Sequence, residues 1–224
     1  MKIVDFAGNH IGQAAQIAKQ NYVEERKHVP ALPSVDTMPD LTPFAENGLG
    51  AAAFDGDTML GFLCSVPPFQ NAFRSTDATG VFSPMGAHGA TGENRAKVYA
   101  RLYQEAGEKW ATAGANSHAI CLYAHDKEVQ AQFFRYGFGL RCVDAIRGMD
   151  EIATSPCTGY DFSELTPDEF PQILPLDHML DAHMAACPAF ILRPSDTQES
   201  LRKKLRAFTQ SFLPPRRMAG LSRT

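Results

Sequence analysis

The chain has 224 residues, of which 44% are hydrophobic and 21% charged, as in an ordinary folded globular protein. Its formal net charge of −4 excludes the strongly basic surface that nucleic-acid binding requires. No stretch approaches the roughly 20 apolar residues of a membrane span, and no apolar run of signal-peptide length follows Met1. We therefore expect a cytoplasmic protein that binds neither nucleic acid nor a membrane.

The five cysteines are an odd number, widely spaced and without a C-x-x-C pair. Three of them, Cys64, Cys121 and Cys142, fall in apolar runs, where a free thiol behaves as a small hydrophobic side chain. This usage favours a reducing compartment over a disulfide framework. His178 and His183 are five positions apart, which is not the spacing of a helical zinc pair, so we predict no metal site.

The N-terminal residues predict a strand and two helices. Residues 2–6 alternate as a strand does, and apolar positions recur at helical spacing from Asn9, a possible cap, as far as Pro30. A shorter second helix is expected with Thr42 as its cap and Pro43 in its first position.

A hairpin and a third strand are predicted next. Two apolar runs, 49–54 and 59–66, flank Asp55-Gly56-Asp57, whose Asp-Gly pair permits the positive φ values of a tight turn. Residues 67–79 are polar, contain two prolines and predict a loop, and residues 80–84 predict a short strand.

The middle of the chain predicts a loop, two helices and two strands. A glycine-dotted loop over 85–92 leads into a long helix from Glu93 to about Ala113, with Gly114 just past its end. The remaining elements expected are a strand over 118–123, a helix over 127–136 and a final strand over 140–146. This order indicates an α/β fold, with a mixed sheet flanked by helices on both faces.

The chain divides into three parts on composition. We predict a domain over 1–150, a linker over 151–160 and a mostly helical extension over 161–224. Within the extension, a strand near residue 160 precedes helical segments over 168–184 and 195–212.

Residues 83–92 and the helix that follows carry the first chemical signal. A strand ending in Pro84, a loop of small residues and a long helix can hold a diphosphate, because the backbone approaches closely and the helix start offers free N–H groups. The same composition also suits an ordinary surface loop, so both interpretations stay open on the loop alone.

The order and spacing of these elements resemble the GNAT superfamily of acyl-coenzyme A N-acyltransferases over about two thirds of the chain. Residues 82–84 (Phe-Ser-Pro) are similar to the Val-x-Pro-like end of the family's fourth strand. Residues 87–92 (Ala-His-Gly-Ala-Thr-Gly) are similar to its (Arg/Gln)-x-x-(Gly/Ala)-x-(Gly/Ala) loop, and 126–138 to its Asn-x-x-Ala-x-x-x-Tyr-x-x-x-Gly-Phe helix. A register beginning at Asn94 puts the long side chain of Lys97 at a small-residue position, so we prefer 87–92.

The resemblance implies a GNAT-like fold and acetyl-CoA or CoA as co-substrate, without a metal. The residues that it implies for coenzyme binding are Ser83, Met85, His88, Gly89, Ala90, Thr91, Gly92, Asp126 and Phe133. Four positions depart from the family pattern: Ala87 replaces its Arg or Gln, Asp126 its Asn, Val129 its Ala, and Phe133 the Tyr that often protonates the leaving thiolate. A phenyl ring cannot donate that proton, so the role is vacant or filled by another residue.

Acyl transfer to an amine needs a deprotonated amine, a polarised thioester carbonyl and a protonated leaving thiol. The backbone amides of Ser83 and Met85 are the candidates for polarising the carbonyl. The catalytic candidates are Glu25, His88 and Tyr123, with Glu24 and Tyr136 as further possibilities. Each also has an ordinary structural interpretation, as a solvated helix end, a phosphate donor or a core side chain.

Three functional hypotheses remain from the sequence. The first is an acetyl-CoA-dependent N-acetyltransferase whose acceptor is a small-molecule or peptide amine. The second is a catalytically degenerate GNAT-like domain that binds a ligand or partner, and the third is an unrelated α/β binding module. The extension resembles the opening unit of a second GNAT-like domain, which suggests the front part of a tandem two-domain acyltransferase. A homodimer is also possible, and the acceptor cannot be predicted.

Overall fold

The computed structural model describes residues 1–74, 78–92, 94–151, 153, 159, 161, 163, 165, 166, 168–187, 197–200, 202 and 203. Contacts divide the chain into two compact units, one of residues 1–73 with 77–151 and the other of residues 74–76 with 152–224. Each unit is described by itself.

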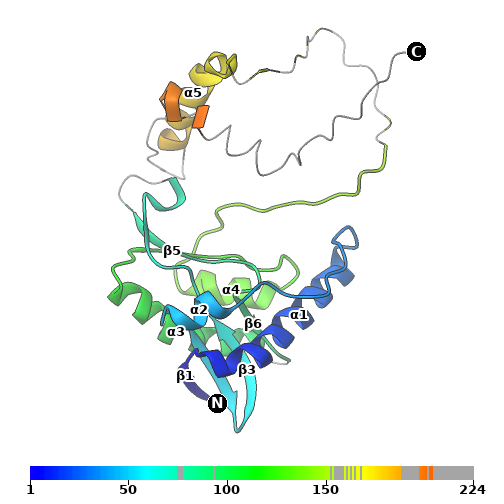
Figure 1. The fold of residues 1–224 in the computed structure, drawn as a ribbon, viewed down its shortest axis with the longest axis vertical. Coiled ribbons are helices and arrows are strands. Elements are labelled where there is room, and N and C mark those ends of the chain that lie inside the picture. Colours follow the sequence, from blue (N-terminus) through cyan, green and yellow to red (C-terminus); the bar gives the residue numbers. More distant parts are fainter. Residues whose placement is uncertain are drawn as a thin grey trace, which may run out of the picture. The chain divides into compact units, whose positions relative to one another are not determined.

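The first unit is an alternation of strands and helices (Figure 1). In chain order its elements are β1 (Lys2–Asp5), a 3₁₀ turn (Gly8–His10), α1 (Ile11–His28), α2 (Thr42–Glu46), β2 (Ala51–Asp55), β3 (Thr58–Leu63), β4 (Phe69–Gln70), a 3₁₀ turn (Ala72–Arg74), β5 (Thr79–Ser83), β6 (His88–Ala90), α3 (Arg95–Thr112), β7 (Ser117–Ile120) and α4 (Lys127–Arg135). The α/β class and the order of the longer elements are as expected from the sequence.

The strands form two sheets that are joined by backbone hydrogen bonds. One sheet has the order β1-β2-β3-β6 with antiparallel neighbours. The other has the order β4-β5-β7, in which β4 and β5 are antiparallel and β5 and β7 are parallel. The residues after β3 join the two, because Cys64 N–H donates to the Ala87 carbonyl (3.0 Å) and Val66 N–H to the Phe82 carbonyl (2.9 Å). Beyond β5 the chain therefore changes neighbour, from β7 to β3.

Helices cover both faces of the sheet because neighbouring strand residues point to opposite sides. Ala51 and Ala53 of β2 belong to a core that includes Leu102 and Trp110 of α3 and Phe133 of α4. Their neighbour Ala52 faces the other core, together with side chains from α1 and Phe62 of β3. The small side chains of β2 let the helices approach the sheet from both sides.

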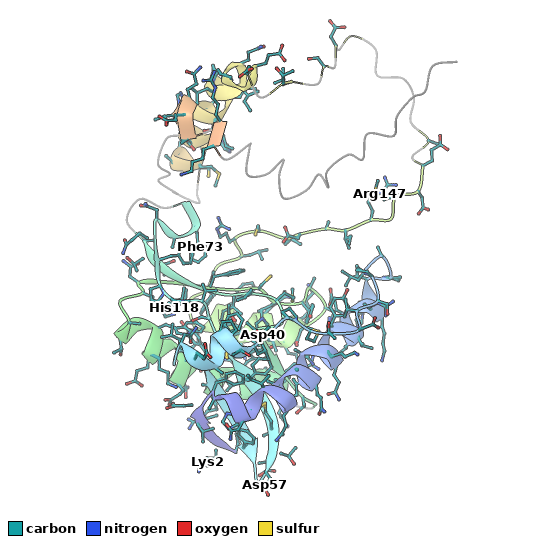
Figure 2. The ribbon with its side chains drawn as sticks, viewed as in Figure 1. Lys2, Asp40, Asp57, Phe73, His118 and Arg147 are labelled. Carbon is teal, nitrogen blue, oxygen red and sulfur yellow. The ribbon has the colours of Figure 1, made fainter. Side chains whose placement is uncertain are left out.

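The predicted hairpin is confirmed. β2 and β3 pair antiparallel across Gly56, which has a φ of +57°, and Asp57 lies at the hairpin tip (Figure 2). The second helix is also confirmed, but Leu41 precedes its first residue and Thr42 lies inside it, so the predicted cap was wrong by one position. The side chain of Asp40 instead accepts a hydrogen bond from the backbone N–H of Thr42 (2.9 Å) at the start of this helix.

Two loop and strand predictions were wrong. Residues 88–90 do not belong to a loop, because they form the buried strand β6, paired with β3. Residues 140–146 do not form a strand, and none of the described sheets includes them. Leu140 and Val143 are consequently 71% and 68% exposed. The predicted loop over 67–79 contains the two-residue strand β4.

The second unit contains a 3₁₀ turn (Phe170–Ile173) that continues into α5 (Leu174–Ala186), close to the helical segment expected there. Glu169 fixes the entry by accepting hydrogen bonds from the backbone N–H and the hydroxyl of Thr166 (2.9 and 2.7 Å). The strand predicted near residue 160 and most of the helix predicted over 195–212 lie outside the described residues.

Two features are absent from the described residues. They contain no helix that is long and apolar enough to cross a membrane. They also contain no group of three or more His, Cys, Asp or Glu side chains that could hold a metal ion.

Candidate functional site: a pocket at the start of α3

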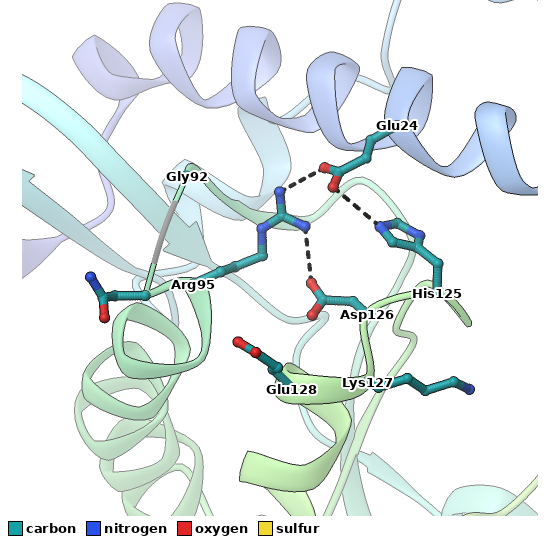
Figure 3. Close-up of a pocket in the computed structure, with 8 residues that line it drawn as sticks. Glu24, Gly92, Arg95, His125, Asp126, Lys127 and Glu128 are labelled. Carbon is teal, nitrogen blue, oxygen red and sulfur yellow. Dashed lines mark hydrogen bonds and ion pairs between the residues drawn. The ribbon is translucent and has the colours of Figure 1, made fainter.

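A pocket of about 290 Å³ lies where three elements meet (Figure 3). The start of α3, the start of α4 and the last part of α1 all contribute to its wall. Its lining residues are Glu24, Gly92, Asn94, Arg95, His125, Asp126, Lys127 and Glu128. The wall therefore combines the free end of a helix with carboxylates and cations.

The start of α3 has no side-chain cap. Asn94 precedes the helix in a left-handed conformation (φ 66°, ψ 21°), and its side chain makes no capping hydrogen bond. Gly92 has a φ of +63°, and an added Cβ there would meet no atom within 4 Å. No acidic residue lies in the first turn, which instead begins with Arg95. A cation at this end opposes the helix dipole, and the carboxylates of Glu24 and Asp126 offset the charge of Arg95.

Arg95 spans the pocket between two carboxylates. Its Nη2 is 2.6 Å from Glu24 Oε2 and its Nη1 is 3.0 Å from Asp126 Oδ2, as the dashed lines in Figure 3 show. Its Nε–H donor is buried without a hydrogen-bond partner among the described residues. A buried donor left unpaired is costly, so the arginine retains one unused contact within a polar pocket.

The ion pairs of this network shift the pKa values of Glu24 and Arg95. The hydrogen bond from Arg95 lowers the pKa of Glu24 below its usual value, against the opposing effect of partial burial. Burial alone would lower the pKa of Arg95, but its hydrogen bonds to Glu24 and Asp126 outweigh burial and raise it. The arrangement is therefore a persistent ion-pair network at neutral pH.

His125 lies beside this network and is bound by the neighbouring carboxylates of α1. Its Nδ1 forms a very short contact with Glu25 Oε2, and its Nε2 is 3.5 Å from Glu24 Oε1. The His28 ring stacks on it at 4.6 Å between centroids, with the planes 8° apart. Nε2 is buried and has no hydrogen-bond partner among the described residues.

Asp126 lines the pocket in the β7–α4 connection, and Tyr123 lies behind the wall against His125. Asp126 caps α4, because Oδ1 accepts from the Val129 N–H (3.3 Å) while Oδ2 holds Arg95. The Tyr123 ring stacks near His125 (6.2 Å, 25°), and its hydroxyl is buried without a hydrogen-bond partner among the described residues. Burial, followed by the nearby charge of Glu25, raises the pKa of Tyr123, so its phenol stays protonated.

The predicted placement of His88 in an open loop was wrong. His88 lies in β6 and is 3% exposed, with Nδ1 2.7 Å from the Tyr99 hydroxyl and Nε2 2.7 Å from the Cys121 carbonyl. Through its hydrogen bond to Cys121, His88 connects β6 to the residue just after β7, although β6 and β7 are not paired in a sheet. Burial lowers its pKa to about 4. Because both ring nitrogens are engaged, His88 has none free to meet a substrate.

The other predicted coenzyme-binding residues of β6 are also buried in the sheet. An added Cβ at Gly89 would lie 3.0 Å from Asn21 Oδ1, so this glycine allows α1 to pack closely. Asn21 then pairs with both backbone groups of Ala90, accepting from its N–H (3.1 Å) and donating to its carbonyl (3.0 Å). The backbone of Thr91 still bonds to the Leu60 carbonyl (2.8 Å).

The structure divides the predicted site residues into two groups. Gly92 and Asp126 line the pocket, and Glu25 and Tyr123 contact its wall through His125. Outside it, Ser83 is fully buried and its hydroxyl has no hydrogen-bond partner among the described residues, whereas Met85 is exposed in the turn after β5.

Phe133 is also outside the pocket wall, because it is 2% exposed in the core against Tyr99, Tyr103 and Phe138. Sequence reasoning missed Arg95 and His125 as site residues. A detectable signal existed for Arg95, since a cation in the first turn of a helix is unfavourable without an anion nearby.

No family model matches the chain, and no curated protein matches it. Several solved structures, in contrast, are similar to this chain. A mutant of the BH1408 protein from Bacillus halodurans is 12% identical with a TM-score of 0.51, over 68% of this chain and 100% of that one. Wild-type TTHA1254 from Thermus thermophilus is 17% identical with a TM-score of 0.45, over 68% and 100%. The aminoglycoside N-acetyltransferase AAC(6')-Iy in complex with CoA is 12% identical with a TM-score of 0.44, over 66% and 95%.

The likeness to BH1408 supports the fold, and the two with TM-scores below 0.5 are too weak to support an inference. The order of the longer strands and helices is the order that the sequence resemblance implied, and β5 and β7 pair in parallel. The fold is GNAT-like. Within this GNAT-like fold, the loop that leads into α3 begins only after Ala90, so the register preferred from the sequence, 87–92, began too early.

Proposed function

We propose that this chain transfers an acetyl group from acetyl-CoA to an amine of a small molecule or peptide. The observation that carries the proposal is the start of α3, where an uncapped helix end and an open Gly92 line one pocket together with the guanidinium-bearing side chain of Arg95. These are donors and space for a doubly charged diphosphate. The GNAT-like fold supports the same conclusion.

The residues present fit a coenzyme diphosphate at this pocket. The backbone around Gly92 and the first turn of α3 would hold it, with Arg95 exchanging a carboxylate partner for a phosphate oxygen. That exchange would release Glu24, which is 38% exposed and free to move into solvent. Acetyl-CoA supplies an activated acyl group, and this chain's residues bind it, orient it and move protons.

Tyr123 is our proposed proton donor to the leaving thiolate. Phe133 is buried at the position where the family pattern has a tyrosine, and the hydroxyl of Tyr123 is buried without a hydrogen-bond partner among the described residues. For the thioester carbonyl we retain the backbone N–H groups near Ser83 and Met85, at the point where β5 ends.

Turnover tests the proposal. Purified protein with acetyl-CoA and a panel of primary amines should release free thiol and yield acetylated amine detectable by mass spectrometry. Tyr123→Phe should lower kcat by about 10²-fold, the usual effect of losing an acid–base group. Tyr22→Phe is the matched control, because the Tyr22 hydroxyl donates to the Pro33 carbonyl at an exposed site (2.8 Å). CoA binding without thiol release for any amine would instead favour the degenerate ligand-binding domain.

A further inference from the structure

We infer that Asn21 competes with CoA for the backbone of Ala90, and that CoA binds by displacing this side chain. The inference rests on the proposed function, because it takes CoA to bind between the start of α3 and the end of β5. It concerns a contact that neither the diphosphate site nor the proposed proton donor uses. This contact joins Asn21 in α1 to Ala90 in β6, 69 positions apart in sequence.

The carboxamide of Asn21 takes the place of a neighbouring strand at Ala90. Its Oδ1 accepts from the Ala90 N–H (3.1 Å), and its Nδ2 donates to the Ala90 carbonyl (3.0 Å). A carboxamide offers the same donor and acceptor as a peptide group, so these are the two kinds of hydrogen bond that an adjacent strand would supply. Asn21 is 6% exposed and Ala90 is 0% exposed, so water does not compete for the contact.

The strand β6 uses one edge for β3 and the other for Asn21. Toward β3, the Thr91 N–H donates to the Leu60 carbonyl (2.8 Å). Because the backbone groups of successive strand residues point to opposite edges, those of Ala90 point away from β3. In the described part of the chain, β6 is the last strand of its sheet and no strand pairs with it on that side. Asn21 therefore covers an open edge.

This open edge lies on the path between the two proposed ends of the coenzyme site. The diphosphate site includes Gly92, just after β6, and the proposed place of the thioester carbonyl lies near Ser83 and Met85, just before β6. The arm of CoA that joins the diphosphate to the thiol contains amide groups, each with an N–H and a C=O. Such an amide would meet the backbone of Ala90 only where Asn21 now binds.

The contact at Ala90 is one that a ligand amide can replace. A buried backbone N–H or C=O without a partner is costly, so this edge needs a partner while no coenzyme is bound. Asn21 supplies that partner in the free protein, and an amide of the arm would supply it in the complex. A purely structural role, in which Asn21 only anchors α1 to β6, predicts instead that the contact persists when CoA binds.

Calorimetric titration of two variants with CoA separates these roles. Asn21→Ala removes the competitor and frees the backbone of Ala90, so CoA should bind about tenfold more tightly than to the wild-type protein. Asn21→Leu is the matched control, because leucine is similar in size and keeps the edge covered, so CoA affinity should not rise. Both substitutions should lower the melting temperature, since each removes the two hydrogen bonds of Ala90 in the free protein.

ADP serves as the second ligand, because it carries a diphosphate without the arm. Its affinity should be the same for the wild-type protein and both variants. Equal CoA affinity in the wild-type protein and Asn21→Ala, or a parallel rise for CoA and ADP, would overturn the competition and leave the diphosphate site in place. No binding of CoA to any of the three proteins would overturn the proposed function, and this inference with it.

A further measurement uses the wild-type protein alone. One side-chain N–H of Asn21 donates to a buried carbonyl, so it should exchange slowly with solvent in the free protein and in the presence of ADP. Saturating CoA should accelerate this exchange at least about tenfold, because the side chain leaves its partner. Slow exchange that saturating CoA leaves unchanged would overturn the inference whatever the titrations show.

Discussion

Lowering the pH from 7 to 4 should reduce the free energy of unfolding by about 3 kcal/mol through His88 alone. Burial lowers the pKa of His88 from 6.5 to about 4 in the folded protein, whereas the unfolded chain protonates near the ordinary value. Between these two pH values the unfolded state binds the extra proton, so stability falls as the pH falls. Urea denaturation followed by circular dichroism across this range measures the slope.

His88→Gln is the control for this pH effect. The variant should be less stable at pH 7, because the Tyr99 hydroxyl and the Cys121 carbonyl lose their buried partner. Its stability should nevertheless change much less between pH 7 and 4. The carboxylates in ion pairs, such as Glu24, have lowered pKa values and lose their contribution mainly at the acid end of this range or below it. An unchanged slope in His88→Gln would contradict this explanation.

Trp110→Ala should cost about 3–5 kcal/mol of unfolding free energy, the usual effect of removing a fully buried aromatic ring. Trp110 of α3 is 0% exposed and its Nε1–H donates to the Leu49 carbonyl (2.9 Å). Its ring also packs edge-on against Tyr103 and His118, at 5.9 and 5.1 Å between centroids. The cavity and the unpaired carbonyl both destabilise the variant.

Trp110→Phe separates these two contributions. It keeps an aromatic ring in the core and loses the hydrogen bond, so we expect a cost of about 1–3 kcal/mol. Trp110 is the only tryptophan of the chain, so unfolding must be followed by circular dichroism rather than by tryptophan fluorescence. A loss below about 1 kcal/mol in Trp110→Ala would show that α3 is not held to the sheet by this side chain.

Local patterns were enough to predict most elements of the first unit. The Asp-Gly turn at residue 56 and the helical repeat of apolar positions in α3 are local signals, and both were confirmed. Gly114 ends α3 as expected, with a φ of +91°. In these places propensity, turn chemistry and burial all favour the same structure.

The strand β6 could not be predicted from its own residues. His88, Gly89 and Ala90 have the small and polar composition of a loop, and their strand structure depends on β3 and on Asn21 of α1. Gly89 therefore serves helix packing rather than phosphate binding. Tertiary contacts override local composition here, and the loop that leads into α3 is shorter than predicted.

The candidate site was only partly predictable for a similar reason. Gly92 and Asp126 were identified because the resemblance to GNAT proteins is local in sequence. The contact of Glu25 with His125 joins residues 100 positions apart, and Arg95 meets Glu24 across 71 positions. Such pairings depend on how α1 packs beside the β7–α4 connection. The tandem-domain, homodimer and cytoplasmic predictions remain untested.

Calorimetric titration with CoA tests the central claim most directly, namely that the start of α3 holds a coenzyme diphosphate. We predict micromolar binding to the wild-type protein and at least a roughly tenfold loss in Gly92→Glu, which places a negative charge against the phosphates. Gly92→Asn is the matched control, because asparagine tolerates the positive φ of +63° and adds no charge, so it should bind nearly as well. No binding at millimolar CoA, or equal binding to the wild-type protein and Gly92→Glu, would contradict the claim.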